Sequence, residues 1–509
     1  MDDLSAPASH DVDTTGPQEH GNSLARNALS LAGNVGIALG SAAPTASIAL
    51  TLAAVVAASS FASPIAILIC GLPMLAIAAA FRRLNRWRVN CGGIYTWGGR
   101  AISPYYGFAA GWVVILAYVV GVVSISLPIG PYVVSVFTSA TSRPGEAIVG
   151  FIAVVLATVV AYIGIRITAW TQWILIAIEY TGVGILAIWC LVSVFSRNPH
   201  SAPFSWSWFS WSSMGGISGF VAASLIAVYM FSGWDTGILV NEETSDSREK
   251  PGNSVVTSVI VLALMFAFLT FALQGAVHTS KLEAAPNALS YIAQVVSGNA
   301  LAKYMILAVA LSALGSTLAS LVSGVRVTFA MGADRVLPYA FAKTSSRFKT
   351  PVLATLVIGV IAAIGVWLYT FGSSSVQSSF DTVVSVDGLL FALFYAMTGI
   401  ATAVYFRKLA RHSAWSFILV ALFPIGAAAF LVYIIYRSVA GLGGWNGSDL
   451  ISLYVMLGIG AAIMLYVRFW GQSEYFSRPR ETYEPESELV AARSSLVNGN
   501  PESDSRDEE

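Results

Sequence analysis

Long apolar stretches separated by short polar segments dominate the chain. A bilayer core about 30 Å thick needs roughly 20 apolar residues in a helix. The stretches reach this length without the alternation that is typical of barrel strands. The pattern therefore predicts an all-α membrane protein with twelve transmembrane helices, in the following ranges: 31–57, 61–81, 104–137, 147–167, 171–195, 216–241, 253–278, 301–329, 351–371, 379–406, 414–437 and 450–470.

The composition agrees with this pattern. Hydrophobic residues make up 56% of the chain and charged residues only 11%, whereas soluble domains carry about 25% charged residues. This much apolar surface exceeds one buried core, so it must face lipid. The formal net charge is zero, which gives no reason to expect a nucleic-acid partner. Cys70, Cys91 and Cys190 are far apart and match no metal or redox spacing, so no disulfide framework is expected.

The distribution of Lys and Arg predicts the orientation. With the N-terminus in the cytoplasm, most of these residues fall in cytoplasmic segments, which favours cytoplasmic positions for both termini in the cell membrane. The polar, acidic tails 1–25 and 472–509 are expected to be disordered. Between them we expect three units: a first five-helix set in 26–195, a second in 216–406, and helices 11 and 12 in 414–471.

The first span contains a helix-breaking sequence, Gly-Ser-Ala-Ala-Pro, at residues 40–44. Pro44 lacks an amide donor and clashes with the carbonyl four residues earlier, so the helix should break or kink there. Backbone groups freed in a membrane are tolerated where they face protein or a watery cavity. Taken alone, the sequence is equally consistent with a simple proline kink.

The sixth span has a comparable interruption, Ser-Gly-Trp-Asp-Thr-Gly, at residues 232–237. Spans 1 and 6 each open a set of five helices, and the two sets have opposite orientations in the membrane. Interrupted spans at corresponding positions of two inverted halves indicate a transporter binding site. The sequence therefore predicts that both breaks meet around a ligand.

Four stretches carry a family resemblance. They are GIALGSAAPTASIA at 36–49, NCGGIYTWGGRAISPYYGFAAGW at 90–112, FSGWDTGILVNEET at 231–244, and RVTFAMGADRVLPYAFAKTSSRFKTP at 326–351. In this order they resemble motifs of the amino acid–polyamine–organocation superfamily of secondary transporters. The resemblance implies a leucine-transporter-type fold, with a 5+5 inverted repeat and two further C-terminal helices. One departure is the Ala-Ala-Pro sequence, where many relatives have Gly-Ser-Gly in span 1.

Helix N-termini attract carboxylates and helix C-termini attract ammonium groups, so the two breaks could hold both ends of an amino acid. The expected substrate-binding residues are Gly40, Ser41, Ala42, Ala43, Thr45, Phe231, Ser232, Gly233, Trp234 and Asp235. Phe231 and Trp234 are candidates for an aromatic lid, with ordinary packing as the alternative. Asp235 would pair with a substrate amine, cap the helix that follows it, or do both.

Two further acidic residues lie within predicted spans. Glu179 is deep in span 5, where relatives often have a lysine, and burial favours the protonated form of a carboxyl group. We expect Glu179 to carry a coupling proton, and the alternative is a hydrogen-bonded structural residue. Asp387 in span 10 is a weaker candidate, either for the outer vestibule or for packing against hydroxyl neighbours. On the cytoplasmic side, Glu242 and Glu243 are candidates for a gate with Arg82, Arg83 or Arg326, and the alternative is that these charges are simply solvated.

These features predict a secondary transporter for an amino acid or related amine, working by alternating access and driven by protons. The alternatives are an exchanger, a permease for a polyamine, choline or γ-aminobutyrate, and, more remotely, a membrane receptor. The sequence has no clustered metal-ligand or catalytic residues and no phosphate-binding Gly-x-x-x-x-Gly-Lys. We therefore expect no enzyme activity, cofactor or metal. Segment 138–146 has no cysteine, so no disulfide-linked heavy-chain partner is expected.

Overall fold

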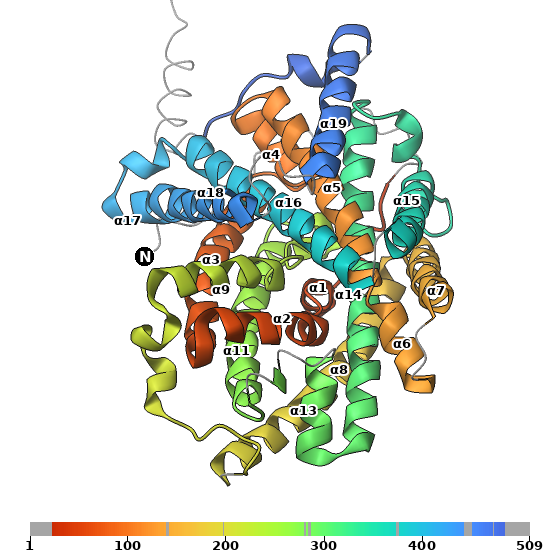
Figure 1. Ribbon diagram of the computed structural model, residues 1–509. Helices are drawn as coiled ribbons and strands as arrows, with labels where there is room; N and C mark the ends of the chain where they lie inside the picture. The colour runs from red at the N-terminus through yellow and green to blue at the C-terminus, as the bar shows by residue number, and fades with distance from the viewer. Residues whose placement is uncertain are drawn as a thin grey trace, which may run out of the picture.

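The computed structural model describes residues 23–138, 142–196, 198–278, 281–282, 287–372, 376–441, 450–471 and 473–483. Within these ranges the chain is helical apart from turns and two isolated bridge pairs. The predicted all-α class is confirmed (Figure 1). Residues 1–22 and 484–509, which form most of the two predicted tails, lie outside the described residues.

The helices follow the predicted spans. Those of the first set are α1 (Leu31–Ser41), α2 (Pro44–Ser59), α3 (Ser63–Trp87), α4 (Ile94–Ala101), α5 (Pro104–Ser126), α6 (Ile129–Phe137), α7 (Arg143–Ile163) and α8 (Ile165–Phe195). Those of the second set are α9 (Gly216–Met230), α10 (Thr236–Leu239), α11 (Lys250–Gln274), α13 (Ala288–Ser297), α14 (Asn299–Ala333), α15 (Val352–Gly372) and α16 (Val376–Tyr405). The last are α17 (Ala414–Phe417), α18 (Phe423–Gly441) and α19 (Ile451–Trp470).

Local sequence signals set where several helices begin. At the start of α1 the Ser30 hydroxyl accepts a hydrogen bond from the Gly33 amide at 3.1 Å. At the start of α5 the Ser103 hydroxyl accepts one from the Tyr106 amide at 3.2 Å. Pro104 takes the first position of α5, where a helix has no use for an amide hydrogen. These residues end the preceding loops and start the spans that follow.

Ten helical stretches among the described residues are long and apolar enough to cross a membrane. One of them, Leu31–Trp87, holds two predicted spans in 57 residues, because α1, α2 and α3 follow one another closely. At the sixth predicted span, α9 has only 15 residues and is followed by the short α10. The total of twelve spans therefore stays a prediction.

Helices of the first set pack against their counterparts in the second set. The contacts join α3 with α11, α5 with α14, and α7 with α15. The two broken spans also meet, with α2 packed on α9 and α1 on α10. Figure 1 shows α1 and α2 near the middle of the bundle, with α3 and α11 on one side and α7 and α15 on the other. Contacts between corresponding helices are what an inverted repeat requires when two halves face each other across an internal axis.

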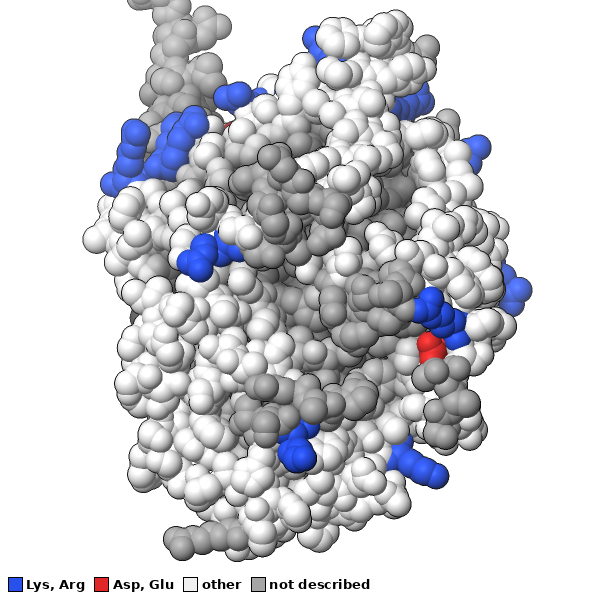
Figure 2. Space-filling view, in the orientation of Figure 1, with Lys and Arg blue, Asp and Glu red and all other residues white. Residues whose placement is uncertain are grey.

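The outer surface of the bundle is apolar where helices face away from it. Leu156 on α7 is 52% exposed, and Phe469 and Trp470 on α19 are 68% and 73% exposed. Figure 2 shows a face on which the described atoms are mostly uncharged, with scattered Lys and Arg. Exposed apolar bands of this kind are typical of helices in contact with lipid.

The C-terminal segment, residues 473–483, packs on the protein. Tyr475 is only 3% exposed, and its ring stacks on Tyr95 with centroids 4.8 Å apart. A side chain at Gly107 would collide with the Tyr475 hydroxyl, so α5 has space for this ring only because glycine stands there. The prediction of disorder is therefore wrong for residues 473–483, because the Tyr475 ring packs against Tyr95 on α4 and Gly107 on α5.

Charged pairs hold the rest of the C-terminal segment. Arg478 contacts Asp334, which follows α14, with Nη2 2.5 Å from Oδ1. Burial lowers the pKa of Arg478, but the hydrogen bond and charge of Asp334 raise it more, so it lies above its usual value. Glu481 pairs with Arg88 at 3.0 Å and with Arg100 at 3.4 Å. The segment thus connects α4, α5 and the end of α14.

We expect Arg478→Gln to loosen this segment. The pair with Asp334 is partly exposed, with 30% and 21% of the two side chains accessible. Losing it should cost about 1 kcal/mol, which corresponds to about fivefold more of the detached form. Limited proteolysis of the C-terminal segment measures this population. Arg480→Gln changes an exposed neighbour in the same segment and should leave cleavage unchanged; equal cleavage of both variants would contradict the prediction.

Candidate functional site

The break in span 1 separates α1 from α2 by two residues. Ala43 has φ 43° and ψ 61°, a left-handed conformation that residues with side chains seldom adopt. Pro44 then begins α2, where its fixed φ favours a helix start. The Ala42 carbonyl, freed by the break, accepts a hydrogen bond from the Ser47 hydroxyl at 2.8 Å. The predicted interruption is therefore a real change of chain direction.

The break in span 6 lies between Met230, which ends α9, and Thr236, which begins α10. Gly233 has φ 94°, and a Cβ there would lie 2.8 Å from Ser41 Oγ and 3.0 Å from the Ser41 carbonyl oxygen. Only glycine lets the two broken spans approach this closely. Gly233 is thus required both for the turn and for the contact between the spans.

Hydroxyl groups connect the two breaks to α14. The Ser323 hydroxyl donates to Thr236 Oγ1 at 2.9 Å, and Thr236 donates to Ser41 Oγ at 2.9 Å. Ser316 donates to the Ser41 carbonyl oxygen at 2.6 Å, so this orphan carbonyl of α1 is satisfied. The three elements form one hydrogen-bonded network without a buried ion pair.

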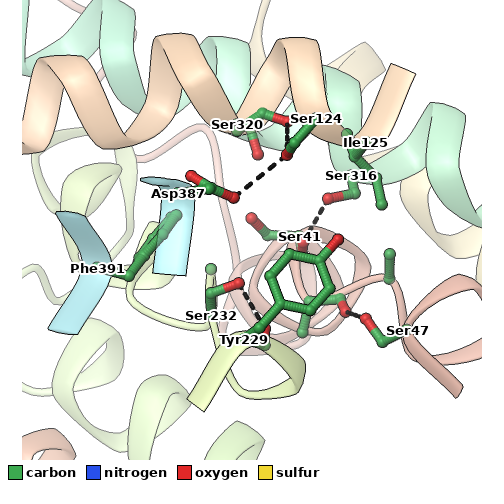
Figure 3. Close-up of a pocket in the computed structure, with 14 residues that line it drawn as sticks. Ser41, Ser47, Ser124, Ile125, Tyr229, Ser232, Ser316, Ser320, Asp387 and Phe391 are labelled. Carbon is green, nitrogen blue, oxygen red and sulfur yellow. Dashed lines mark hydrogen bonds between the residues drawn. The ribbon is translucent and has the colours of Figure 1, made fainter. Parts of the chain in front are cut away.

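A cavity lies beside this network, with an empty volume of about 320 Å³ that includes space open to solvent. It is lined by Ser41, Ala42, Ala43, Ser47, Gly121, Ser124, Ile125, Tyr229, Ser232, Gly233, Ser316, Ser320, Asp387 and Phe391. Figure 3 shows side chains from α1, α5, α9, α14 and α16 directed toward a common space.

Five of the ten predicted binding residues line the cavity, namely Ser41, Ala42, Ala43, Ser232 and Gly233. The others, Gly40, Thr45, Phe231, Trp234 and Asp235, are absent from its lining. Phe231 packs edge-on against Phe266, and Trp234 stacks on Tyr395 with centroids 5.0 Å apart. Both aromatic rings are fully buried in the helix packing.

Asp235 is bound by two tyrosines. The Tyr118 hydroxyl donates to Oδ2 and the Tyr395 hydroxyl to Oδ1, each at 2.6 Å. The cap that the sequence suggested is not formed, because the Asp235 side chain makes no hydrogen bond to the first amides of α10. The carboxyl group instead fixes α10 to α5 and α16, and it is completely buried.

We expect Tyr395→Phe to lower the free energy of unfolding by about 1–3 kcal/mol, because Asp235 Oδ1 is left without a donor in a buried place. Thermal unfolding in detergent measures the loss. Tyr433→Phe removes a hydroxyl from a residue that is 41% exposed and should change stability by less than about 0.5 kcal/mol. A Tyr395→Phe protein as stable as the Tyr433→Phe protein would contradict the assignment.

Glu179 lies outside the cavity lining, at the junction of α8, α2 and α14. Its carboxyl group is next to Thr45 and Ser312, and it is 1% exposed. Its Oε2 atom has no hydrogen-bond partner among the described residues. The Ser312 hydroxyl also accepts from the Ala46 amide at 3.3 Å. The carboxyl group is therefore placed at the start of α2, where the free amides of the broken span are.

Gln172 is a site-adjacent residue that the sequence did not indicate. Its amide nitrogen donates to the Gly315 carbonyl oxygen at 2.7 Å, which joins α8 to α14. A Cβ at Gly40 would collide with Gln172 Oε1, so the end of α1 packs directly on this side chain. A lone glutamine in an apolar span is the only signal for it.

A buried ion pair joins α14 to the segment that follows α10. Arg326 donates from Nε to Glu243 Oε2 at 2.9 Å and from Nη2 to Oε1 at 3.0 Å, and both side chains are 0% exposed. Glu242 does not join the pair; its Oε1 accepts from the Cys91 amide at 2.9 Å. Burial raises the pKa of Glu242, while this hydrogen bond opposes the shift.

Membrane-length helices, two of them interrupted beside a buried polar cavity, define a multi-pass membrane transporter. The chain matches the family described as amino acid permease over residues 27–462. It therefore belongs to the amino acid permease family, within the amino acid–polyamine–organocation superfamily. The resemblance found in the sequence motifs is confirmed.

Individual relatives are distant. An uncharacterised transporter of Mycobacterium tuberculosis is 26% identical over 302 residues, which cover 58% of this chain and 65% of that protein. A branched-chain amino acid permease of Bacillus subtilis is 23% identical over 54% of this chain and 60% of its own length. The aligned region thus spans under two thirds of these relatives.

The fold is that of a solved manganese transporter of Eremococcus coleocola. The TM-score is 0.57 at 15% identity, and the match covers 86% of this chain and 92% of the other. At this identity the likeness shows the fold alone. It confirms the predicted leucine-transporter-type architecture.

Proposed function

We propose that this protein is a secondary transporter that moves an amino acid or related amine across the membrane by alternating access. The observation that carries the proposal is the meeting of two broken spans at one polar cavity, with Ser41 and Gly233 in its lining. Non-helical backbone at membrane depth is tolerated where it lines such a cavity, and in transporters it binds the substrate.

With the N-terminus in the cytoplasm, as the distribution of Lys and Arg predicts, a buried ion pair closes the cytoplasmic side, which supports alternating access. Arg326 and Glu243 connect α14 to the segment after α10, and the Glu243 carbonyl oxygen accepts from the Ala28 and Leu29 amides at 2.8 and 3.0 Å. These contacts join both broken spans to α14 on the side of the cavity where we expect the cytoplasm. Opening the cavity to the cytoplasm requires that they separate, so we assign them the role of an inner gate.

We assign the coupling ion as a proton carried by Glu179. Its carboxyl group contacts α2 and α14 together, so a relative movement of the two elements changes its surroundings. A buried carboxyl with a free oxygen atom can take up or lose a proton as that environment changes. The protein would then couple substrate movement to a proton gradient.

The experiment is transport by the purified protein in liposomes, with a panel of labelled amino acids and amines and with or without a pH gradient. Accumulation that follows the gradient supports proton symport. Uptake that requires substrate inside the vesicle indicates an exchanger instead. If no compound of the panel moves under either condition, the proposed function is wrong.

A further inference from the structure

Asp387 on α16 is the acidic side chain of the cavity, and its carboxyl group is incompletely paired. It is 3% exposed, and its Oδ2 accepts a hydrogen bond from the Ser124 hydroxyl at 3.2 Å. Its Oδ1 has no hydrogen-bond partner among the described residues. In Figure 3 the side chain reaches from α16 into the space between Ser124 and Ser232. A buried carboxyl oxygen without a donor is costly, so this position favours a ligand that supplies one.

Space for that donor lies toward α5. A Cβ at Gly121 would stand 3.5 Å from Asp387 Oδ1, in ordinary contact and with no other atom nearer. The ring of Phe391 lines the cavity one helical turn after Asp387. An aromatic face next to a carboxylate favours an ammonium group, which gains both a charge pair and a cation–π contact.

The described lining offers no positive charge to balance a substrate carboxylate. None of its fourteen residues is Lys, Arg or His. The start of α2 is also partly occupied, since the Ala46 amide donates to Ser312 and Glu179 lies next to Thr45. The remaining polar groups are mostly neutral hydroxyls. A zwitterion brings its own carboxylate, which no basic side chain of the lining would balance, whereas a ligand of charge +1 would form one neutral pair with an ionised Asp387.

We propose that Asp387 binds the ammonium group of the substrate and makes the cavity selective for small ligands of net charge +1. Such a ligand is an amine without a carboxylate, or an amino acid that carries a second ammonium group. The inference rests on the proposed transport function and names the substrate class of the same cavity. Asp387 then sets specificity through charge, while Ser124 holds its carboxyl group in position.

The test compares three probes of similar length: lysine with charge +1, norleucine with charge 0, and n-butylamine with charge +1. Their affinities are measured by competition against a labelled substrate in liposomes, for the wild type and for Asp387→Asn. The wild type should prefer lysine and butylamine over norleucine by tenfold or more, which is about 1.4 kcal/mol. Asp387→Asn should remove this preference by weakening lysine and butylamine binding tenfold or more relative to norleucine binding.

A second variant protects the test against a misfolded Asp387→Asn protein. Gly121→Ala keeps the charge but fills the space beside Oδ1, so it should weaken lysine and butylamine binding more than norleucine binding. Equal binding of all three probes by the wild type would overturn the proposal, as would an equal loss for all three in both variants. If norleucine is transported and the two cations are not, the charge selectivity is refuted and the transport function stands. If no amino acid or amine is transported, the transport function itself is refuted.

Discussion

Replacing Arg326 by methionine is expected to lower the free energy of unfolding by about 3–5 kcal/mol, because it leaves a buried carboxylate without its counter-charge. Both side chains of the Arg326–Glu243 pair are 0% exposed, and two hydrogen bonds join them. Glu243 is fully buried, and among the described ion pairs it contacts Arg326 alone. Thermal or denaturant unfolding in detergent measures the loss.

A double variant separates this effect from simple loss of contact. Arg326→Met together with Glu243→Met removes both charges, so most of the stability should return. The Arg86–Glu249 pair serves as a control, since 31% and 35% of its side chains are exposed. Arg86→Met should cost no more than about 1 kcal/mol. A double variant as unstable as the single one would show that the two charges do not depend on each other.

Glu179→Gln is expected to abolish accumulation driven by a pH gradient. One pH unit is worth about 1.36 kcal/mol per proton, so 1:1 symport at zero membrane potential should concentrate the substrate about tenfold. Without a titratable group, the variant should reach only equal concentrations on both sides. The measurement is steady-state uptake into liposomes with the membrane potential clamped at zero.

Exchange of internal for external substrate should persist in Glu179→Gln, because the cavity lining does not include this residue. Glu474→Gln changes an exposed glutamate in the C-terminal segment and should accumulate substrate like the wild type. Gradient-driven accumulation of the same size in Glu179→Gln would exclude Glu179 as the proton carrier. Loss of exchange as well would show that the residue is needed for the transport movement itself.

Local chemistry made the two helix breaks predictable. Pro44 and Gly233 act through their own backbone, one by lacking an amide hydrogen and the other by adopting φ 94°. The spans were predictable for the same reason, since the length of an apolar helix is read directly from neighbouring residues. The sequence therefore located the two breaks, and five of the ten residues predicted to bind substrate line the cavity beside them.

Contacts across the bundle were not predictable. Asp235 looked like a ligand-binding carboxylate, yet its partners Tyr118 and Tyr395 are 117 and 160 positions away. Ser124 and Ser316 line the cavity from helices whose sequence shows only ordinary spans. Which polar residue faces the cavity and which faces a tyrosine depends on helix rotation, and one sequence does not show it. For this reason Asp387 appeared weaker than Asp235.

The anchored position of Tyr475 between Tyr95 and Gly107 has a practical consequence for handling the protein. A purification tag or fluorescent protein that replaces the residues after Trp470 would remove Tyr475 and the ion pair of Arg478 with Asp334. It would also expose the surfaces of α4 and α5 that Tyr475 covers. Fusions placed beyond residue 483 keep Tyr475 in its position. Yield and melting temperature of the two kinds of fusion should therefore differ, although both leave every transmembrane helix intact.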